Sequence, residues 1–277
     1  MRLVYHLMVH KDPAQVGRLL HALSHPENRY LIHVDKKAGP RAYREFVAAV
    51  GSAPNVTFMP QRSVIWAGFS MVAVELDAIK HALAELGDWD FIINLSGQDF
   101  PLKSQTEMRQ TLASQRDSNF IHVKDFLDRE YCLNRIRFWT VETPRGLWRT
   151  RTRRRQPSWF VPYGGASWFI LGRSFCEYLL TSSRARKLRK FYRYAAHPDE
   201  AYFQTVLMNS PFRVTLCLDY KRFILWDGAG AHPETLTLAD LPAMVGSEAF
   251  FARKFDANVD SEVIERLEQR LRCRDGC

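Results

Sequence analysis

The segment His197-Pro198-Asp199-Glu200 combines residue types that acid–base catalysis uses. Proline at the first helical position would place Asp199 and Glu200 in the first turn of a helix, where the helix dipole stabilises their ionised forms. A carboxylate held in its ionised form can act as a general base and take the proton of an attacking hydroxyl group. Acidic residues in a first turn also stabilise helices without any catalytic role. Both interpretations of this segment are open at this point.

Polar residues follow several apolar runs, at the points where buried strands would end. Ser96-Gly97-Gln98-Asp99 follows the apolar residues 91–95, and His10 and Asp35 follow two earlier runs. The carboxyl ends of parallel strands meet at one edge of a sheet, where ligands bind, so these residues are expected to converge on a ligand site. The alternative for residues 96–99 is a polar turn that satisfies its own hydrogen bonds.

Two further segments place charges where a diphosphate or a metal ion could bind. Arg253 and Lys254 lie between phenylalanines and could neutralise a diphosphate without a metal ion, although aromatic packing with solvated cations would give the same pattern. Asp88-Trp89-Asp90 has the carboxylates that hold a divalent cation. It precedes the strand predicted at 91–96 and lies at the end opposite the crevice. We therefore interpret it as a turn and expect no metal site.

Familiar cofactor and nucleophile motifs are absent. The sequence contains neither GxGxxG nor GxxxxGK[ST], which disfavours dinucleotide-binding and P-loop proteins. It also lacks GxSxG, although residues 163–167 (Tyr-Gly-Gly-Ala-Ser) predict a tight turn where backbone could approach a ligand. The cysteines are odd in number and form no CxxC pair, which predicts reduced thiols: Cys132, Cys176, Cys217, Cys273 and Cys277.

Strands and helices alternate along the first hundred residues. Asp12-Pro13 predicts a capped helix start, and Ser104 with Glu107 predicts a capping box. Such alternation is typical of βαβ units and predicts an α/β fold with a mainly parallel central sheet flanked by helices. No repeat or change of composition divides the chain, so we expect a single domain over residues 1–277. Apolar runs predict strands at residues 3–9, 30–35, 55–59 and 91–96.

Beyond residue 120 the alternation is less regular. The Arg-rich residues 145–158 are expected to form a loop. Pro198 predicts the start of a helix that continues to about Met208, and residues 263–271 carry the spacing of a final amphipathic helix.

The net charge of +9 is concentrated in two segments, around 145–155 and 184–193. They hold 12 of the 39 basic residues and no acidic residue, so the remainder has 27 basic against 30 acidic residues, or −3. Concentrated positive charge indicates a surface for nucleic acid, anionic lipid or an acidic substrate, and a merely solvated face is the alternative. The first residues, MRLVYHLMVH, hold no apolar run long enough for a signal peptide or a spanning helix, so we expect a cytoplasmic protein.

Taken in order, several segments resemble the core-2/I-branching glycosyltransferase family, which includes β-1,6-N-acetylglucosaminyltransferases and peptide O-xylosyltransferases. The resemblance spans about residues 3 to 270, and the sequence looks like a compact bacterial member. It rests on YLIHVDKKA, SVIWAGFSMVAVELDAIKHAL, WDFIINLSGQDFPLKS, GGASWFILGRSF, HPDEAYFQTVLMNSPF and FFARKFD.

This resemblance implies a GT-A-like fold and transfer of a sugar from a UDP-sugar, with inversion and without a metal ion or other cofactor. Glu200 would be the general base. Lys254 would contact the diphosphate, and either Arg253 or Arg222 would replace an arginine that the family has near residues 232–234. The other residues implied are His10, Asp35, Trp66 and Asp99 for the donor, and Arg135 and Trp226 for the acceptor.

We therefore predict a metal-independent transferase that uses UDP-N-acetylglucosamine first and UDP-xylose second, with a glycan or lipid-linked glycan as acceptor. Arg149–Arg155, near Trp148 and Trp159, are expected to contact anionic membrane, or equally an acidic acceptor, on the inner face of the membrane. Two alternatives are a nucleic-acid-binding protein that uses the arginine clusters and an inactive UDP-sugar-binding protein. Nucleic acid is disfavoured because no recognition motif is present. A two-carboxylate glycosidase is also disfavoured, because hydrolysis needs no nucleotide pocket.

Overall fold

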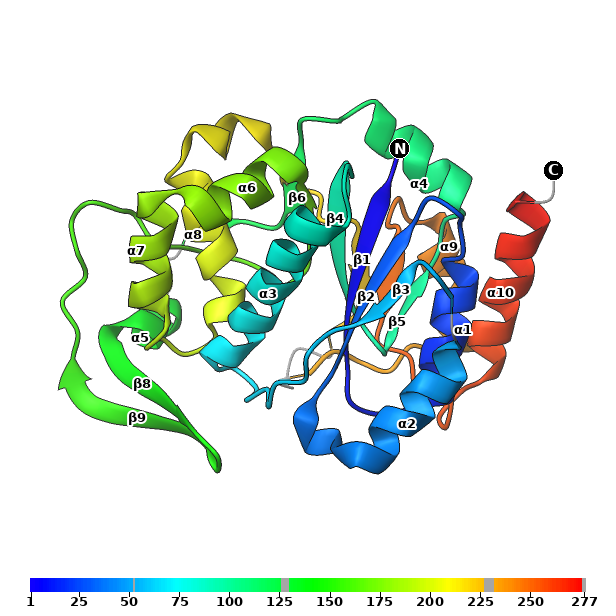
Figure 1. The fold of residues 1–277 in the computed structure, drawn as a ribbon, viewed down its shortest axis with the longest axis horizontal. Coiled ribbons are helices and arrows are strands. Elements are labelled where there is room, and N and C mark those ends of the chain that lie inside the picture. The colour runs from blue at the N-terminus through cyan, green and yellow to red at the C-terminus, as the bar shows by residue number, and fades with distance from the viewer. Residues whose placement is uncertain (52, 126–129, 227–231, 276–277) are drawn as a thin grey trace. The chain divides into compact units, whose positions relative to one another are not determined.

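The computed structural model describes residues 1–51, 53–125, 130–226 and 232–275. The chain forms two compact units (Figure 1). The first contains Met1–Met59, Leu95–Arg116 and Lys221–Cys277, and the second contains Pro60–Asn94 and Asp117–Tyr220. The chain passes between the units within strand β4 (Phe91–Ser96), whose last two residues already belong to the first unit.

Parallel strands form the sheet of the first unit. β1 (Leu3–Val9), β2 (Arg29–Val34) and β3 (Val56–Phe58) pair in that order. β1 and β2 are almost continuously buried, as expected of parallel strands that are covered on both faces. A second, small sheet has the order β13-β14-β5, with β13 at Arg222–Ile224, β14 at Phe251–Arg253 and β5 at Asp99–Pro101.

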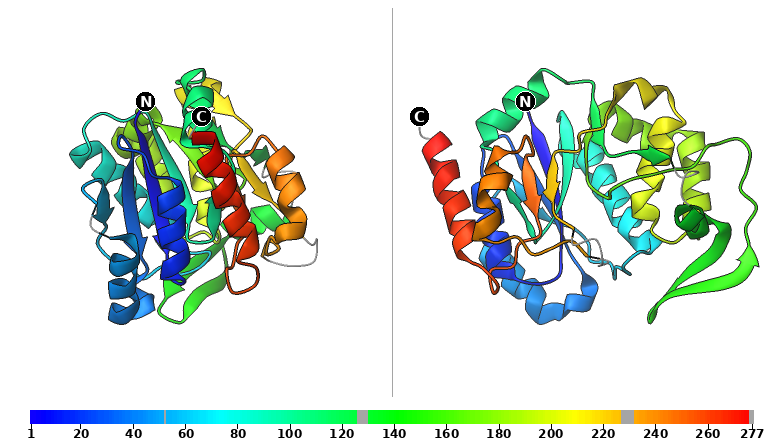
Figure 2. Two further views of the ribbon diagram at one scale, coloured as in Figure 1. Left: turned by 90° about the vertical axis from the view of Figure 1, so that its right-hand side faces the viewer. Right: turned by 180° about the vertical axis from the view of Figure 1, so that it is seen from behind.

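Helices cover the first unit, and α10 lies beside α1 in Figures 1 and 2. Arg18 of α1 donates to both carboxylate oxygens of Glu268 of α10, at 2.7 and 3.0 Å. The capping box predicted for Ser104 and Glu107 is confirmed at the start of α4. The helices are α1 (Pro13–Ala22), α2 (Gly39–Val50), α4 (Gln105–Ala113), α9 (Leu241–Gly246) and α10 (Glu262–Asp275), with short 3-10 turns at Lys36–Ala38 and Leu238–Asp240.

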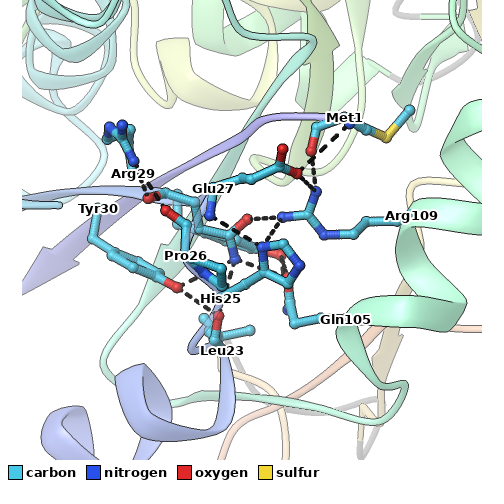
Figure 3. Close-up of polar contacts among 11 residues, drawn as sticks. Met1, Leu23, His25, Pro26, Glu27, Arg29, Tyr30, Gln105 and Arg109 are labelled. Atoms are coloured by element: carbon cyan, nitrogen blue, oxygen red, sulfur yellow. Dashed lines mark hydrogen bonds and ion pairs between the residues drawn. The ribbon is translucent and has the colours of Figure 1, made fainter. Parts of the chain in front are cut away.

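A buried polar cluster joins the starts of β1 and β2 to α4 (Figure 3). The Tyr30 hydroxyl donates to the Leu23 carbonyl at 2.6 Å, and Asn28 donates to Gln105 at 2.8 Å. Arg109 donates to the Met1 carbonyl and pairs with the Glu27 carboxylate. Apart from Arg109 Nε, these groups satisfy one another, as most buried polar groups do. This cluster therefore holds the strand starts, whereas the candidate ligand residues follow the strand ends.

The second unit combines several paired strands with a long hairpin. β11 (Phe169–Gly172) is antiparallel to both β4 and β6 (Asn119–Ile121), and β12 (Leu216–Cys217) is parallel to β6. The hairpin pairs β8 (Phe138–Thr143) with β9 (Gly146–Arg153), and β7 (Lys124–Asp125) pairs with β10 (Tyr163–Gly164). Its helices are α3 (Phe69–Glu85), α5 (Glu130–Arg137), α6 (Arg173–Thr181), α7 (Ser183–Tyr192) and α8 (Tyr202–Met208), with 3-10 turns η2 (Pro198–Glu200) and η3 (Pro211–Thr215).

The predicted fold class, α/β with a mainly parallel central sheet flanked by helices, is confirmed. Three local predictions are wrong. Residues 145–158 are not a loop, because 146–153 form β9. The helix expected from Pro198 to Met208 is interrupted at Ala201, whose φ of −147° is not helical. Asp12 does not cap α1 through its side chain, which instead pairs with Lys11 at 3.4 Å.

Within the described residues, no helix is both long and apolar enough to cross a membrane. Cys176, Cys217 and Cys273 are free thiols, while the side chain of Cys132 and the whole of Cys277 lie outside the part of the chain that is described.

Candidate functional site

Glu200 and Arg135 form an ion pair in the second unit. The Arg135 Nη1 atom donates to Glu200 Oε2. Arg135 comes from α5, and its carbonyl accepts from the Ala196 amide at 2.9 Å, so the chain that leads into η2 lies against α5. The Glu200 side chain is 33% exposed and the Arg135 side chain 18%. The carboxylate is therefore held in one orientation and still reaches solvent.

The backbone before Glu200 adopts an unusual conformation. His197 and Ala67 have φ values of 48° and 61°, although neither is glycine, and the His197 amide donates to the Ala67 carbonyl at 2.8 Å. Non-glycine residues in the left-handed region cost free energy and concentrate at functional sites. The Trp66 ring meets the His197 ring edge to face, with centroids 5.1 Å apart. Burial lowers the pKa of His197, and the charge of Arg135 lowers it further, so the imidazole is neutral at neutral pH.

Asp199 binds into the turn that the sequence marks at residues 163–167. Its carboxylate accepts from the Ser167 hydroxyl at 2.7 Å, and the neighbouring Glu200 carbonyl accepts from the Gly165 amide at 2.9 Å. A Cβ atom on Gly165 would lie 1.7 Å from the His122 carbonyl oxygen, so this position requires glycine. The turn at residues 163–167 therefore packs closely against η2 and against the backbone at His122. Burial raises the pKa of Asp199 to about 6, and the charge of Glu200 adds to this effect.

The hairpin contributes a carboxylate to the segment that carries Trp66. Glu142 of β8 accepts from the Ser70 amide at 2.6 Å and from the Ser70 hydroxyl at 2.8 Å, at the first turn of α3. A negative charge at a helix N-terminus is favourable, and it satisfies an amide that has no partner within the helix. Gly68 leaves the space for this carboxylate, because a Cβ there would lie 2.0 Å from Glu142 Oε1.

In the first unit, residues 96–99 form a turn whose side chains hydrogen-bond within the turn. Asp99 is fully buried, and its carboxylate accepts from both the amide (2.7 Å) and the hydroxyl of Ser96. Asp99 on β5 is also the register partner of Arg253 on β14, and their side chains form an ion pair with Nε 3.6 Å from Oδ1. A Cβ on Gly97 would lie 2.9 Å from Val16, so the turn packs closely on α1. The Asp99 carboxylate thus orients Arg253.

Lys254 follows Arg253 in sequence, but its charged group has different surroundings. Among the described residues, no carboxylate forms an ion pair with the Lys254 ammonium group. Its carbonyl accepts from the Leu236 amide at 2.9 Å, and the Glu234 amide donates to Leu225 at 2.9 Å. These bonds bring Trp226, which is 56% exposed, into the same region as Lys254. A cation with no carboxylate partner among the described residues can receive an anionic ligand.

His10 and Asp35 follow adjacent strands, as expected. The Asp35 amide donates to the Val9 carbonyl at 2.9 Å, and the Asp35 carboxylate accepts from the Lys37 amide at 2.9 Å. Burial lowers the pKa of His10, Lys11 lowers it further, and Asp35 opposes both. Nearby, Lys11 pairs with Asp256 at 3.2 Å, which links the end of β1 to the residues after β14.

The predicted residues therefore gather as two sets, one in each unit. The first unit holds His10, Asp35, Asp99, Trp226, Arg253 and Lys254, and the second holds Trp66, Arg135 and Glu200. Sequence reasoning marked the turn that contains Ser167 but not the bond of its hydroxyl group to Asp199. It missed Glu142, because no spacing pattern marks this residue. Within the described ranges, His, Cys, Asp and Glu side chains form no group of three or more that could hold a metal ion.

Residues 3–251 match the model of the Core-2/I-Branching enzyme family. The chain is 36% identical to xylosyltransferase 2 of Rattus norvegicus over 98% of its length, and 31% identical to the xylosyltransferase of Ciona intestinalis over the same share. It spans about a third (34%) of the length of each relative. A crystal structure of the galactosyltransferase LgtC with donor and acceptor sugar analogues is 12% identical, with a TM-score of 0.47, over 98% of this chain and 96% of the other.

Proposed function

Since the chain belongs to the Core-2/I-Branching enzyme family, we propose that it is an inverting glycosyltransferase that moves a sugar from a UDP-sugar to an acceptor hydroxyl group. One observation carries this proposal: the carboxylate of Glu200 is fixed by Arg135 yet remains partly exposed. The α/β fold agrees with the GT-A type that the sequence resemblance implies.

Glu200 acts as the general base in the proposed reaction. It takes the proton of the acceptor hydroxyl while the oxygen attacks the anomeric carbon, and the bond from that carbon to the UDP oxygen breaks on the opposite face. The new bond has inverted configuration, and no covalent enzyme intermediate is needed. Arg135 orients the carboxylate, and the His197 carbonyl accepts from the Glu200 amide at the end of η2.

The leaving diphosphate needs positive charge, which Lys254 supplies. Arg253 adjoins it, and Asp99 holds Arg253 in place from the buried side. Because two adjacent cations can neutralise the charge that develops on the diphosphate, we propose that transfer does not depend on a metal ion. The sequence resemblance assigns His10, Asp35 and Trp66 to the donor, and Arg135 and Trp226 to the acceptor.

The proposed donor is UDP-xylose, because the similar proteins carry the name xylosyltransferase. UDP-N-acetylglucosamine, which the sequence resemblance ranks first, is the second candidate. The proposed acceptor is a hydroxyl of a glycan or lipid-linked glycan. The side chains that line a pocket, rather than the fold, determine which donor and which acceptor an enzyme uses.

A thermal-shift titration tests the proposal without an acceptor. UDP, UDP-xylose, UDP-N-acetylglucosamine and UDP-glucose are each added with and without EDTA. A ligand at about 100 times its Kd stabilises the folded protein by about 2.7 kcal/mol. We expect UDP and UDP-xylose to raise the melting temperature equally in both conditions, and Lys254→Gln to reduce the shift. Lys80→Gln, which removes an exposed charge from α3, is the matched control and should keep it. No shift with any nucleotide would refute the proposed function, and a shift abolished by EDTA would refute metal independence.

A further inference from the structure

The two arginine-rich segments of the sequence form one surface. Residues 154–160 run alongside α7, and Arg154 donates to the carbonyls of Phe191 (2.5 Å) and Tyr194 (2.9 Å) at its C-terminal end. At the other end of α7, Arg184 donates to the Trp159 carbonyl at 2.6 Å. The hairpin and α7 are neighbours in Figures 1 and 2. We call the surface of the hairpin, residues 154–160 and α7 the basic face.

Arg154 attaches the hairpin firmly to α7. Its guanidinium stacks on the rings of Trp139, at 4.8 Å, and Phe191, at 4.1 Å. Burial lowers the pKa of Arg154 to about 10, which leaves it charged at neutral pH. The Thr140 amide also donates to the Tyr194 carbonyl at 3.0 Å. The end of the hairpin that carries Trp139, Thr140 and Arg154 is therefore fixed to the C-terminal end of α7.

The charge of this surface is almost entirely positive. From residue 143 to residue 198 the chain has 13 basic residues and a single acidic one, Glu177, which pairs with Arg173 on α6. Among the described residues, none of the exposed cations of the basic face forms an ion pair. These eleven are Arg145, Arg149, Arg151, Arg153, Arg155, Arg184, Arg186, Lys187, Arg189, Lys190 and Arg193. So many like charges on one surface repel one another, which an anionic partner would relieve.

Large aromatic rings are exposed among these charges. Trp148 on β9 is 62% exposed, Trp139 on β8 is 40% exposed, and Trp159 is 39% exposed. Water-exposed indole rings cost free energy unless a partner covers them, and tryptophan is enriched where proteins meet the interfacial region of a bilayer. Phosphate contacts alone would require only the cations. The combination of both residue types therefore favours a membrane surface over a duplex nucleic acid. A single-stranded nucleic acid, whose bases also stack on indole rings, is an outcome of the test.

We propose that the basic face binds the surface of a membrane that contains anionic phospholipid. The arginines and lysines contact the lipid phosphates, and Trp148 and Trp159 enter the headgroup region. This inference concerns a surface outside the proposed reaction and does not depend on it. If the acceptor is lipid-linked, the same surface would hold the enzyme at its substrate.

Vesicle co-sedimentation tests the proposal with the whole chain. We expect binding to vesicles of phosphatidylcholine mixed with phosphatidylglycerol, little binding to phosphatidylcholine alone, and weaker binding as salt is raised. Each cation near an anionic surface adds about five-fold to the affinity. Two variants, one with Arg149, Arg151, Arg153 and Arg155 and the other with Arg186, Lys187, Lys190 and Arg193 changed to Gln, should each lose roughly two orders of magnitude or more.

A matched control removes four exposed charges elsewhere: Arg41, Arg44, Arg266 and Arg272 to Gln. It should bind vesicles within a few-fold of wild type. All variants should melt near the wild-type temperature, because the replaced side chains are exposed. Equal losses in the control and the two variants would overturn the proposal, since net charge would then explain binding.

Trp148→Ala separates a membrane from other polyanions. It should weaken vesicle binding by about ten-fold and reduce the blue shift of tryptophan fluorescence that vesicles cause. Its affinity for a single-stranded oligonucleotide should be unchanged if that binding is purely electrostatic. Tighter binding to the oligonucleotide than to anionic vesicles at the same salt, with no fluorescence shift on vesicles, would overturn the proposal in favour of nucleic acid.

Discussion

Two carboxylate–arginine pairs, one in each unit, have the same chemistry and different surroundings. Asp99 is fully buried, and its partner Arg253 is 15% exposed. Glu200 is 33% exposed, and its partner Arg135 is 18% exposed. Asp99 also accepts from Ser96. The Glu200 amide instead donates to the carbonyl of His197, whose backbone is in the left-handed conformation.

This difference assigns different roles to similar residues. The buried Asp99 carboxylate, with its partner opposite it in the sheet, holds the turn at residues 96–99 and orients Arg253. A partly exposed carboxylate on a strained backbone can meet a substrate. The sequence cannot distinguish these cases, because burial depends on which strands pair. The following variants test whether the two pairs differ as described.

The largest expected effect comes from breaking the buried pair. Asp99→Asn would leave the Arg253 charge without its carboxylate in the interior, so we expect the free energy of unfolding to fall by about 3–5 kcal/mol. Urea unfolding measures this. The matched control is Asp77→Asn, which breaks an exposed pair with Arg62 (2.6 Å) and should cost less than about 1 kcal/mol. Equal losses of unfolding free energy in the two variants would show that the Asp99 carboxylate is not buried away from water.

Asp199 gives an effect of intermediate size that depends on pH. Because its pKa is raised to about 6 in the folded protein, the folded state holds a proton that the unfolded state releases near pH 4. The wild-type protein should therefore lose about 2–3 kcal/mol of stability as pH rises from 4 to 7. Asp199→Asn should remove this loss, because its amide oxygen can still accept from Ser167. A stability difference between wild type and variant that did not change over this range would contradict the assignment.

The smallest effect on stability is expected at Arg135. Arg135→Gln breaks a partly exposed pair, so the free energy of unfolding should change by less than about 1 kcal/mol. The same change removes a positive charge that lowers the pKa of His197, so His197 should titrate at a higher pH. Proton NMR of the histidine ring measures this shift. A loss of stability as large as that of Asp99→Asn would mean that the two pairs are alike.

Regular apolar patterns made much of the fold predictable. The strands at 3–9 and 91–96 occur with the predicted bounds, because each is an unbroken buried run. The hairpin strand 146–153 was missed, since both of its faces are polar and no apolar alternation marks it. A weaker signal was present: Thr150 and Thr152 alternate with arginines after the turn residues Pro144 and Gly146. The merging of the two basic segments into one surface depends on this hairpin.

The candidate site was predictable only in part. Sequence position alone suggested Glu200 beside a helix start, and the structure places it in a 3-10 turn. The pairing of Asp99 with Arg253 follows from the register of β5 and β14, which lie 150 residues apart in sequence and which no local pattern indicates. Contacts of this kind arise from tertiary packing.

One measurement tests the central claim most directly: UDP release from UDP-xylose by wild type and by Glu200→Gln, with pooled serine peptides and oligosaccharides as acceptors. We expect wild type to release UDP with inversion at the transferred sugar, and the variant to bind UDP normally while kcat falls by about 10²–10⁴-fold. A folded Glu200→Gln protein that releases UDP as fast as wild type would contradict the claim that Glu200 is the base.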